Sequence, residues 1–516
     1  MKWYAKILIA IASIVILVLL LNVGLNFWIA RKLPQIINEQ NNSPYQITYK
    51  ELKISLLDRN LHATEIIAVP KVSLNAVASK EGYYAKIRSV DINGFSIWNI
   101  LSGNRITAKR LIINYPEAIL FRGVPKKEKK KLLGNVAYFN KIIYVSDIVI
   151  KHGNFGITDI VKNEQVLKVS NISFQVEGIF IDDKTLSQKI PFTYQDFKFG
   201  SDSLYYRMPF YSIRTKKVAA TARTVVIEAP KLIPLYSRKT FVKMISVEKD
   251  LYTVASKNIS LKNIDWGFKG DDFFFHTTSL LLNGLDANAY RGKMVQDDLK
   301  KKKLFSRMLR EIKYDLKVDT LRIKNATIVY EEEKDAAHGA GKIAFNRFNL
   351  YAVNVQSGFK KKKVPDVNIH ITSKFMGVSP FTADWSFNVL DKSDGFKIKG
   401  RLLHFPAEKL APFTKPYSNT IVQGDLEEIY FDFSGNDLKS QGTFSINYDN
   451  LKVKVYRKNE RKKKNKLLSA IVNLFVKNDS KERIKSTKVS VDRVPEKSFF
   501  NLLWITAADG LKKILL

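Results

Sequence analysis

Residues that could carry out catalysis or hold a metal are few in this sequence, and their spacing does not bring them together. No two of the six histidines stand at a spacing that would place both on one predicted element, which argues against a histidine metal site. The acidic clusters Asp271-Asp272 and Glu331 to Glu333 fall at the ends of predicted strands, where solvated turns explain them. The chain has no cysteine, so disulfides, thiolate nucleophiles and cysteine-bound metals are excluded.

One segment, Gly339-Ala340-Gly341-Lys342, is similar to the end of a phosphate-binding loop. It lacks the first glycine of that motif at the required spacing, and Ile343 stands where the motif needs serine or threonine. No Gly-x-Ser-x-Gly nucleophile elbow occurs. We therefore predict a protein that is not an enzyme and needs no cofactor and no metal. The alternative is an enzyme whose carboxylates are paired only by the fold.

The composition is strongly basic, with 85 Lys and Arg against 49 Asp and Glu and a net charge of +36. Solvated loops, an anionic membrane surface and nucleic acid are three explanations for such a charge. The lysine runs are not interleaved with stacking aromatic residues as in RNA-binding modules, so we expect no nucleic-acid partner. At a membrane surface, lysines in these runs would contact lipid headgroups. The candidate headgroup-contacting residues are Lys129, Lys130, Lys301, Lys302, Lys462 and Lys463.

The first structural element that the sequence predicts is an apolar segment near the N-terminus. Between Lys6 and Arg31 no residue is charged, and a helix of that length reaches about 36 Å, enough to cross a bilayer. Trp3, Tyr4 and Trp28 flank the segment, as aromatic residues do at membrane interfaces. We predict an uncleaved anchor with a short cytoplasmic tail in residues 1–31. A cleaved secretory signal is the alternative.

Most of the remaining chain alternates apolar and polar residues with the period of a β-strand. The turn signals Gly435-Asn436-Asp437 and Asp449-Asn450 separate three such runs near the C-terminal end, which predicts an antiparallel meander. The alternating apolar positions that illustrate the pattern best are Leu52, Ile54, Leu56, Ile429, Phe431, Phe433, Phe444, Ile446, Tyr448, Leu451, Val453 and Val455.

The chain also repeats a local pattern at irregular intervals. The run Ile148-Val-Ile150-Lys-His-Gly-Asn-Phe155 aligns with Leu321-Arg-Ile323-Lys-Asn-Ala-Thr-Ile328. In both, a strand is followed by small or polar residues and a second strand whose apolar positions have the opposite parity, as a bulge or tight turn would produce. We therefore expect one long sheet built from related units.

Helical patterns are few. Apolar residues follow a helical stripe in 297–315 and in 466–477, and the segment 498–516 is apolar nearly all round. We expect the last helix either to cap the end of the sheet or to insert into a membrane or a partner. The predicted organisation is a tail and anchor in residues 1–31, an elongated β region in residues 32–456, and a basic linker with amphipathic helices in residues 457–516.

Several segments resemble one family. The anchor is followed by Ile47-Thr-Tyr-Lys-Glu-Leu-Lys-Ile54, then by Ile92-Asn-Gly-Phe95 and by Leu111-Ile-Ile-Asn-Tyr-Pro116. Val422-Gln-Gly424-Asp-Leu426 and Gly442-Thr-Phe444 stand near the other end. In these patterns the chain resembles the AsmA-like proteins of the Gram-negative envelope, which are similar to the repeating β-groove, bridge-like class of lipid transfer proteins. The resemblance covers the chain from the anchor to about residue 456.

The resemblance implies a mainly β fold: an elongated, curved antiparallel sheet that forms an apolar groove, with an N-terminal transmembrane helix and a few amphipathic helices towards the C-terminus. It implies a single-pass inner-membrane protein with its bulk in the periplasm, which moves or shelters lipids between inner and outer membrane. Its partners would be a phospholipid or other envelope lipid, the inner membrane through the N-terminal helix, and the outer membrane or a protein through the C-terminal helix.

An amphipathic sheet must cover its apolar face, and too few helices are predicted to do so. Either a second sheet covers that face, or a groove remains that lipid can fill. The alternative function is therefore a periplasmic scaffold or assembly factor with a closed core and no lipid transport. The residues that would line a groove are Ile54, Leu56, Ile148, Ile150, Leu321, Ile323, Phe431, Phe433, Phe444 and Ile446.

Overall fold

The chain folds mainly into β-strands, as predicted: strands account for 64% and helices for 12% of the residues described in a computed structural model. The structure describes residues 45–55, 59–71, 81–96, 105–123, 142–335, 337–457, 460–464, 480 and 483–515. The predicted anchor in residues 1–31 lies outside these residues. Among the described residues, no helix has both the length and the apolar character needed to cross a bilayer.

The chain divides into two compact units, which the sequence did not predict. Unit 1 comprises residues 1–208 and 215–222, and unit 2 comprises residues 209–214 and 223–516. The elements of unit 1 are β1 (Tyr45–Thr48), β2 (Glu51–Ser55), β3 (Asn60–Pro70), β4 (Gly82–Asn93), β5 (Arg105–Arg122), β6 (Ile142–Asp159), β7 (Glu164–Ile181), α4 (Asp183–Leu186), β8 (Asp196–Ser201), β9 (Ser203–Arg207) and β11 (Val218–Thr221).

The elements of unit 2 are more numerous and include four α-helices and one 3-10 helix, η2. They are β10 (Tyr211–Thr215), β12 (Thr224–Glu228), β13 (Lys231–Pro234), α5 (Arg238–Met244), β14 (Asp250–Ala255), β15 (Asn258–Lys262), β16 (Asp265–Lys269), β17 (Asp272–Asn283), β18 (Asp286–Gly292), α6 (Phe305–Arg310), β19 (Asp315–Glu333), β20 (Ala340–Gln356), β21 (Val367–Phe375), β22 (Ser379–Phe387), β23 (Phe396–Pro406), η2 (Ala407–Leu410), α7 (Ala411–Ser418), β24 (Thr420–Gly435), β25 (Lys439–Arg457), β26 (Glu460–Lys464), β27 (Lys485–Asp492) and α9 (Phe499–Leu515).

The sheets are mixed, so the prediction of a purely antiparallel sheet is wrong at three pairings. In unit 1, β5 pairs with β6 in parallel. In unit 2, β19 runs parallel to both β17 and β18. Residues 123–141 and 293–314 separate these parallel neighbours, and parallel pairing needs a crossover of about a dozen residues or more. From β19 to β25, each strand pairs with the next in the antiparallel meander that the alternation predicts.

The repeated pattern corresponds to long strands that contain a bulge. His152 in β6 and Asn325 in β19 have positive φ angles, and the pairing register shifts beside each of them. The extra residue changes the parity, so the apolar side chains stay on one face through the bend. Asn450 has the same conformation within β25, so the predicted turn at Asp449-Asn450 is wrong. The predicted turn at Gly435-Asn436-Asp437 is confirmed, because it joins β24 to β25.

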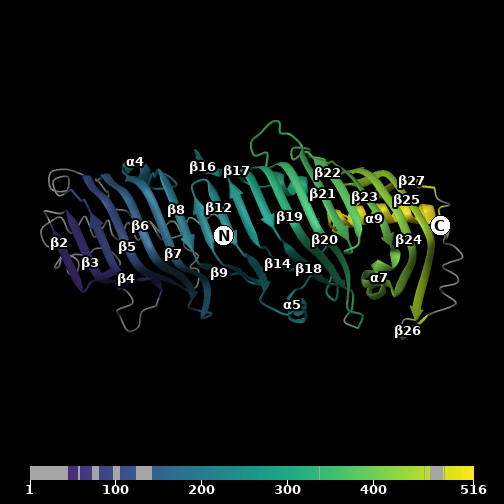
Figure 1. Ribbon diagram of the computed structural model, residues 1–516, viewed down its shortest axis with the longest axis horizontal. Coiled ribbons are helices and arrows are strands. Elements are labelled where there is room, and N and C mark those ends of the chain that lie inside the picture. The colour runs from purple at the N-terminus through teal and green to yellow at the C-terminus, as the bar shows by residue number, and fades with distance from the viewer. Residues whose placement is uncertain are drawn as a thin grey trace. The chain divides into compact units, whose positions relative to one another are not determined.

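Helix α9 matches the predicted C-terminal helix, whereas α6 covers only a short part of the predicted segment 297–315. The predicted helix in 466–477 lies outside the described residues. Figure 1 shows α9, in yellow, lying across the last strands of unit 2, and its residues contact β25 and β27. A core of buried residues forms beneath it, with Phe433, Phe444 and Ile446 at its centre.

We predict that Ile446→Ala destabilises unit 2 by about 2–5 kcal/mol, because it leaves a cavity in a closed core where Ile446 is 0% exposed. Urea unfolding followed by tryptophan fluorescence measures the change. Thr443→Ala, on the opposite face of the same strand, is the control and should stay within about 0.5 kcal/mol. Equal effects of the two substitutions would contradict the assignment of the faces.

Candidate functional site

Two rows of apolar residues run across ten strands of unit 2. Residues paired across neighbouring strands point to the same face of a sheet, so each row lies on one face. We call them the first and the second ladder, and the face that carries them the ladder face. The first ladder consists of Val225, Leu261, Leu280, Leu321, Ala352, Ile369, Trp385, Ile398 and Phe433, and ends at Gly442 in the tenth strand. The second ladder consists of Ile227, Ile259, Leu282, Ile323, Leu350, Ile371, Ala383, Gly400, Phe431 and Phe444.

The opposite face of the same strands is mostly polar. Its paired row includes Arg322, Tyr351, His370, Asp384, Lys399 and Asp432. Asp384 lies 2.7 Å from His370 and 3.9 Å from Lys399 on the neighbouring strands. Water can solvate this face, whereas the ladder face loses free energy wherever it meets water.

The chain itself covers the ladder face over β22 to β27. The ring of Phe499 in α9 stacks on Trp385, with centroids 4.8 Å apart. A side chain on Gly510 would place its Cβ 2.5 Å from Cγ of Phe444, so the helix lies directly on the strand. Phe433, Phe444 and Ile446 are buried there, and Phe431 is partly buried. Of the predicted groove-lining residues, these four therefore belong to the closed end of unit 2.

The ladder face stays partly exposed from β12 to β21. Of the ladder residues in β12, β15, β17, β19, β20 and β21, all but Ala352 are partly exposed. Leu321 and Ile323, both predicted to line a groove, lie in the middle of this stretch. We call it the open section. Its side chains keep part of the apolar area that an antiparallel sheet normally buries on one face.

Unit 1 carries a comparable pair of rows. Ile148 pairs with Leu111 and Val176, and Ile150 pairs with Ile113 and Phe174. Ile148 and Ile150, also predicted to line a groove, are both buried in the core of unit 1. Ile54 of β2 pairs with Leu61 of β3, but the side chain of Ile54 lies outside the described part of the structure. Leu56 lies wholly outside it.

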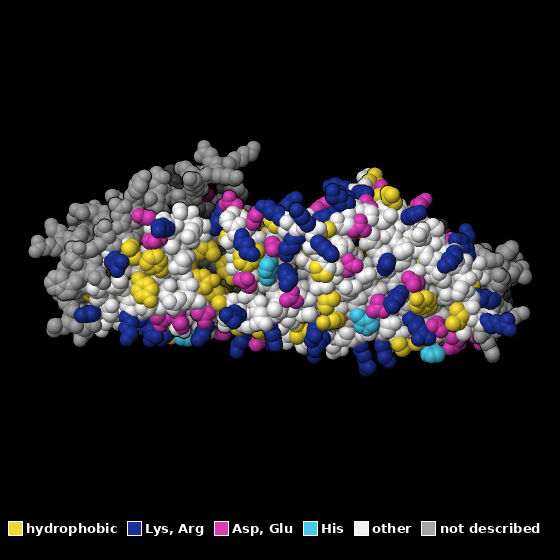
Figure 2. Space-filling view, turned by 90° about the horizontal axis from the view of Figure 1, so that it is seen from above, with side chains coloured by type: hydrophobic (Ala, Val, Ile, Leu, Met, Phe, Trp, Pro, Cys, Tyr) yellow, Lys and Arg dark blue, Asp and Glu magenta, His cyan; other side chains and the backbone are white. Residues whose placement is uncertain are grey.

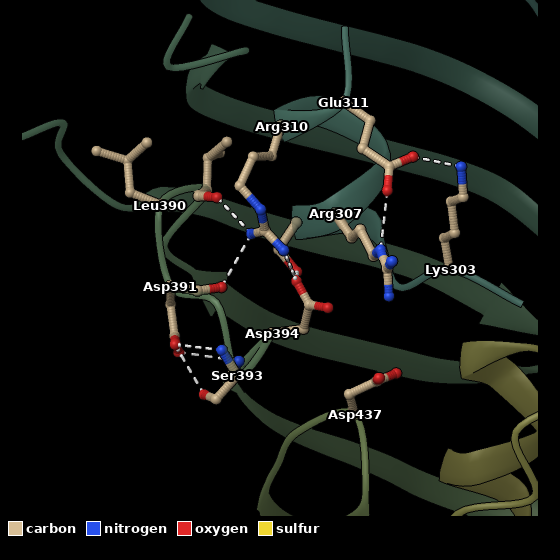
Figure 3. Close-up of polar contacts among 12 residues, drawn as sticks. Lys303, Arg307, Arg310, Glu311, Leu390, Asp391, Ser393, Asp394 and Asp437 are labelled. Atoms are coloured by element: carbon tan, nitrogen blue, oxygen red, sulfur yellow. Dashed lines mark hydrogen bonds and ion pairs between the residues drawn. The ribbon is translucent and has the colours of Figure 1, made fainter. Parts of the chain in front are cut away.

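Buried hydrogen bonds and an ion pair hold the helix α6 against the closed end of unit 2 (Figure 3). Arg310 donates to the carbonyl oxygens of Val389, at 2.6 Å, and Asp391, at 2.9 Å, and its Nη2 lies 2.7 Å from Oδ1 of Asp394. Ser306 donates to the same Asp394 oxygen at 2.8 Å. The Asp394 side chain is nearly inaccessible to water, so the guanidinium and the hydroxyl compensate its buried charge.

A second set of contacts, ion pairs that are exposed to solvent, lies at the C-terminal end of α6. Glu311 pairs with Lys303 and, at 2.9 Å, with Arg307. Hydrogen bonds from Lys303 and then Arg307 lower the pKa of Glu311 to about 2. The carboxylate therefore stays charged well below the ordinary pKa of glutamate.

The structure describes the side chains of two of the six predicted headgroup lysines. Lys301 pairs with Asp437, and Lys302 pairs with Asp298. Lys129 and Lys130 lie outside the described residues, and Lys462 and Lys463 belong to β26 with their side chains undescribed. Figure 2 shows other lysine and arginine side chains spread over much of one face, with acidic and hydrophobic side chains between them.

Sequence reasoning found Leu321 and Ile323 but missed most of the open section. Leu261, Leu280, Leu350 and Ile369 belong to it, and each stands in an alternating run. The alternation could have marked them as facing one side of a strand. It could not have placed them in one row, because register depends on which strands pair.

No family model matches the chain, and no curated protein matches it in sequence. Among the residues that the structure describes, no group of three or more acidic or histidine side chains is placed to hold a metal ion. The candidate site is the open section of the ladder face, whose chemistry is that of an apolar surface.

We predict that Asp394→Asn loosens α6, because it removes the buried carboxylate charge that pairs with the partly buried Arg310. Losing one partner of a buried pair costs about 3–5 kcal/mol. Limited proteolysis by trypsin should then cut after Lys303 or Arg307 faster than in the wild type. Asp432→Asn, on the exposed face, is the control and should leave the cleavage rate unchanged.

We predict a pH dependence of the same helix from Glu311. Its pKa is lowered on folding, so its contribution to stability is complete above the unfolded pKa of about 4.5 and is lost as the pH falls towards about 2. Cleavage by pepsin near α6 should accelerate over this window, and less so in Glu311→Gln. An identical pH profile in that variant would contradict the assignment.

Proposed function

We propose that this chain binds lipid acyl chains on the open section of its ladder face and so moves or shelters lipids between membranes, without catalysing a reaction. The observation that carries the proposal is that six strands keep a continuous apolar row partly exposed. Leaving such a surface in water costs about 25 cal/mol for each Å². A hydrocarbon guest would remove that cost without any covalent chemistry.

The open section is long enough for an acyl chain. Five spacings of about 4.8 Å separate β12 from β21 along the ladders, which is about 24 Å. One leaflet of a bilayer holds its acyl chains in half of a hydrocarbon core of about 30 Å, which is about 15 Å. A lipid tail lying across the strands would therefore contact four or more of them.

The proposal includes the arrangement that the AsmA-like resemblance implies. Residues 1–31 would anchor the chain in the inner membrane, and an elongated, curved sheet in the periplasm would form an apolar groove for a phospholipid or another envelope lipid. The C-terminal helix would meet the outer membrane or a partner protein. Phe500 and Trp504, one turn apart on α9, are 64% and 55% exposed and could make that contact.

A closed scaffold is the second candidate function, and one observation favours it. Over β22 to β27 the ladder face is filled by α6 and α9, as in a protein that needs no guest. A scaffold of this kind would use its polar outer face to hold partners and would carry no lipid. The two functions differ in what occupies the open section.

We predict that Leu321→Asp abolishes lipid binding and leaves the protein folded, because the side chain is partly exposed and a charge there meets water. Purified full-length protein should take up fluorescent phosphatidylglycerol from vesicles, and this variant should lose at least about tenfold in uptake. Thr320→Asp adds the same charge to the opposite face of β19 and is the control. Lipid uptake that is equal in both variants, or absent from the wild type, would refute the proposal.

A further inference from the structure

Both ladders pass from partly exposed to buried at the same place in the sheet. In the first ladder Ile369 of β21 and Trp385 of β22 are partly exposed, and Ile398 of β23 is buried. In the second ladder Ile371 of β21 is partly exposed, and Ala383 of β22 is buried. The open section therefore ends between β21 and β23 on both ladders.

Aromatic rings from two helices close the first ladder at Trp385. Phe499 of α9 stacks on the indole, with ring centroids 4.8 Å apart, and Phe305 of α6 meets it edge-on at 5.0 Å. Phe305 and Phe499 also meet edge to face, with centroids 5.9 Å apart. Trp385 is nevertheless partly exposed, so it is the last residue of the first ladder that a guest in the open section could contact. We call the rings of Trp385, Phe305 and Phe499 the end wall.

A single ring fills the second ladder beyond the same strand. Gly400 of β23 follows Ala383 in this ladder and pairs with Phe431 of β24. A side chain on Gly400 would place its Cβ 2.3 Å from Cζ of Phe431. The phenyl ring therefore lies over the glycine, in the space that a guest on this ladder would need.

The helix that supplies Phe305 is fixed to the two strands at which the ladders close. Asp394 lies in the connection between β22 and β23 and is 2% exposed. Its Oδ1 accepts from Nη2 of Arg310, at 2.7 Å, and from the hydroxyl of Ser306, at 2.8 Å, both on α6. Separating a buried ion pair leaves an uncompensated charge, so displacing α6 is costly. A guest would therefore meet the end wall in place.

We propose that the end wall stops an acyl chain at Trp385, so that the open section has one closed end and is not a channel through to β27. This inference rests on the proposed lipid function and adds how a guest enters and leaves. It would do so across the exposed ladder face between β12 and β21, and would not slide along the ladders towards α9.

The test places a diazirine amino acid with a small aliphatic side chain at position 321, 369 or 398 of the full-length protein, which is illuminated with phosphatidylglycerol vesicles. The otherwise unchanged protein should give lipid adducts at 321 and 369 and none at 398. Phe305→Ala should produce adducts at 398, because it removes one ring of the end wall. Met308→Ala is the matched control, because its side chain is exposed on the same helix, and it should produce none.

The outcomes separate this inference from the function on which it rests. Adducts at 398 without Phe305→Ala overturn the end wall, whereas those at 369 still uphold the acyl site. Absence of adducts from both 321 and 369 overturns both proposals. If Phe305→Ala keeps its adducts at 321 but gains none at 398, the role of this ring is refuted.

A second measurement does not depend on the folding of Phe305→Ala. Phosphatidylglycerol with brominated acyl chains quenches the fluorescence of tryptophans that it contacts. The full-length wild type should lose fluorescence that the variant Trp385→Phe lacks from the start, so the quenching should be smaller in that variant. Equal quenching in the two proteins would show that the guest does not reach Trp385 and would overturn the end wall.

Discussion

The structure of unit 2 depends on the need to keep one face of a large sheet out of water. Two apolar rows, one residue per strand in each, make that face unfavourable to expose to water. At the C-terminal end the chain meets the need with its own helices, and Phe499 and Gly510 bring α9 into direct contact with the strands. In the open section the ladder face is only partly covered, and the proposed function follows from that difference.

The bulges let long strands bend without turning their apolar residues outward. Beyond Asn325, Ala326 is buried and Ile328 pairs with Phe345, so the parity change keeps apolar residues paired through the bend. Unit 1 uses the same device: His152 in β6 stacks on Tyr115 of β5, and both have positive φ angles. Each bulge bends its strand and increases the local twist, while the pairing continues on both sides of it.

Local pattern predicted the strands and their faces but not their arrangement. The alternation around Leu321, Phe431 and Phe444 identified one apolar face correctly. It could not show that β19 runs parallel to β17, because direction depends on the path of residues 293–314. Asn450 was misread as a turn because asparagine with a positive φ angle serves turns and bulges alike.

The candidate site was predictable only in part for a similar reason. Phe433, Phe444 and Ile446 have the same alternation as Leu321 and Ile323, yet they are buried because a helix from a later part of the chain lies on them. Whether a helix covers a strand depends on the tertiary structure, which the periodicity of the sequence does not encode. The ion pairs of Lys301 and Lys302 likewise depend on residues that the fold brings to them.

The most direct measurement of the central claim is photo-crosslinking of a light-activated amino acid placed in turn at positions 320 to 323 of β19 and at position 444. The purified full-length protein would be mixed with phospholipid vesicles and then illuminated. Lipid adducts at 321 and 323, and none at 320, 322 or 444, are the result that the account predicts. Adducts that do not follow this alternation, or that are absent from all five positions, would contradict it.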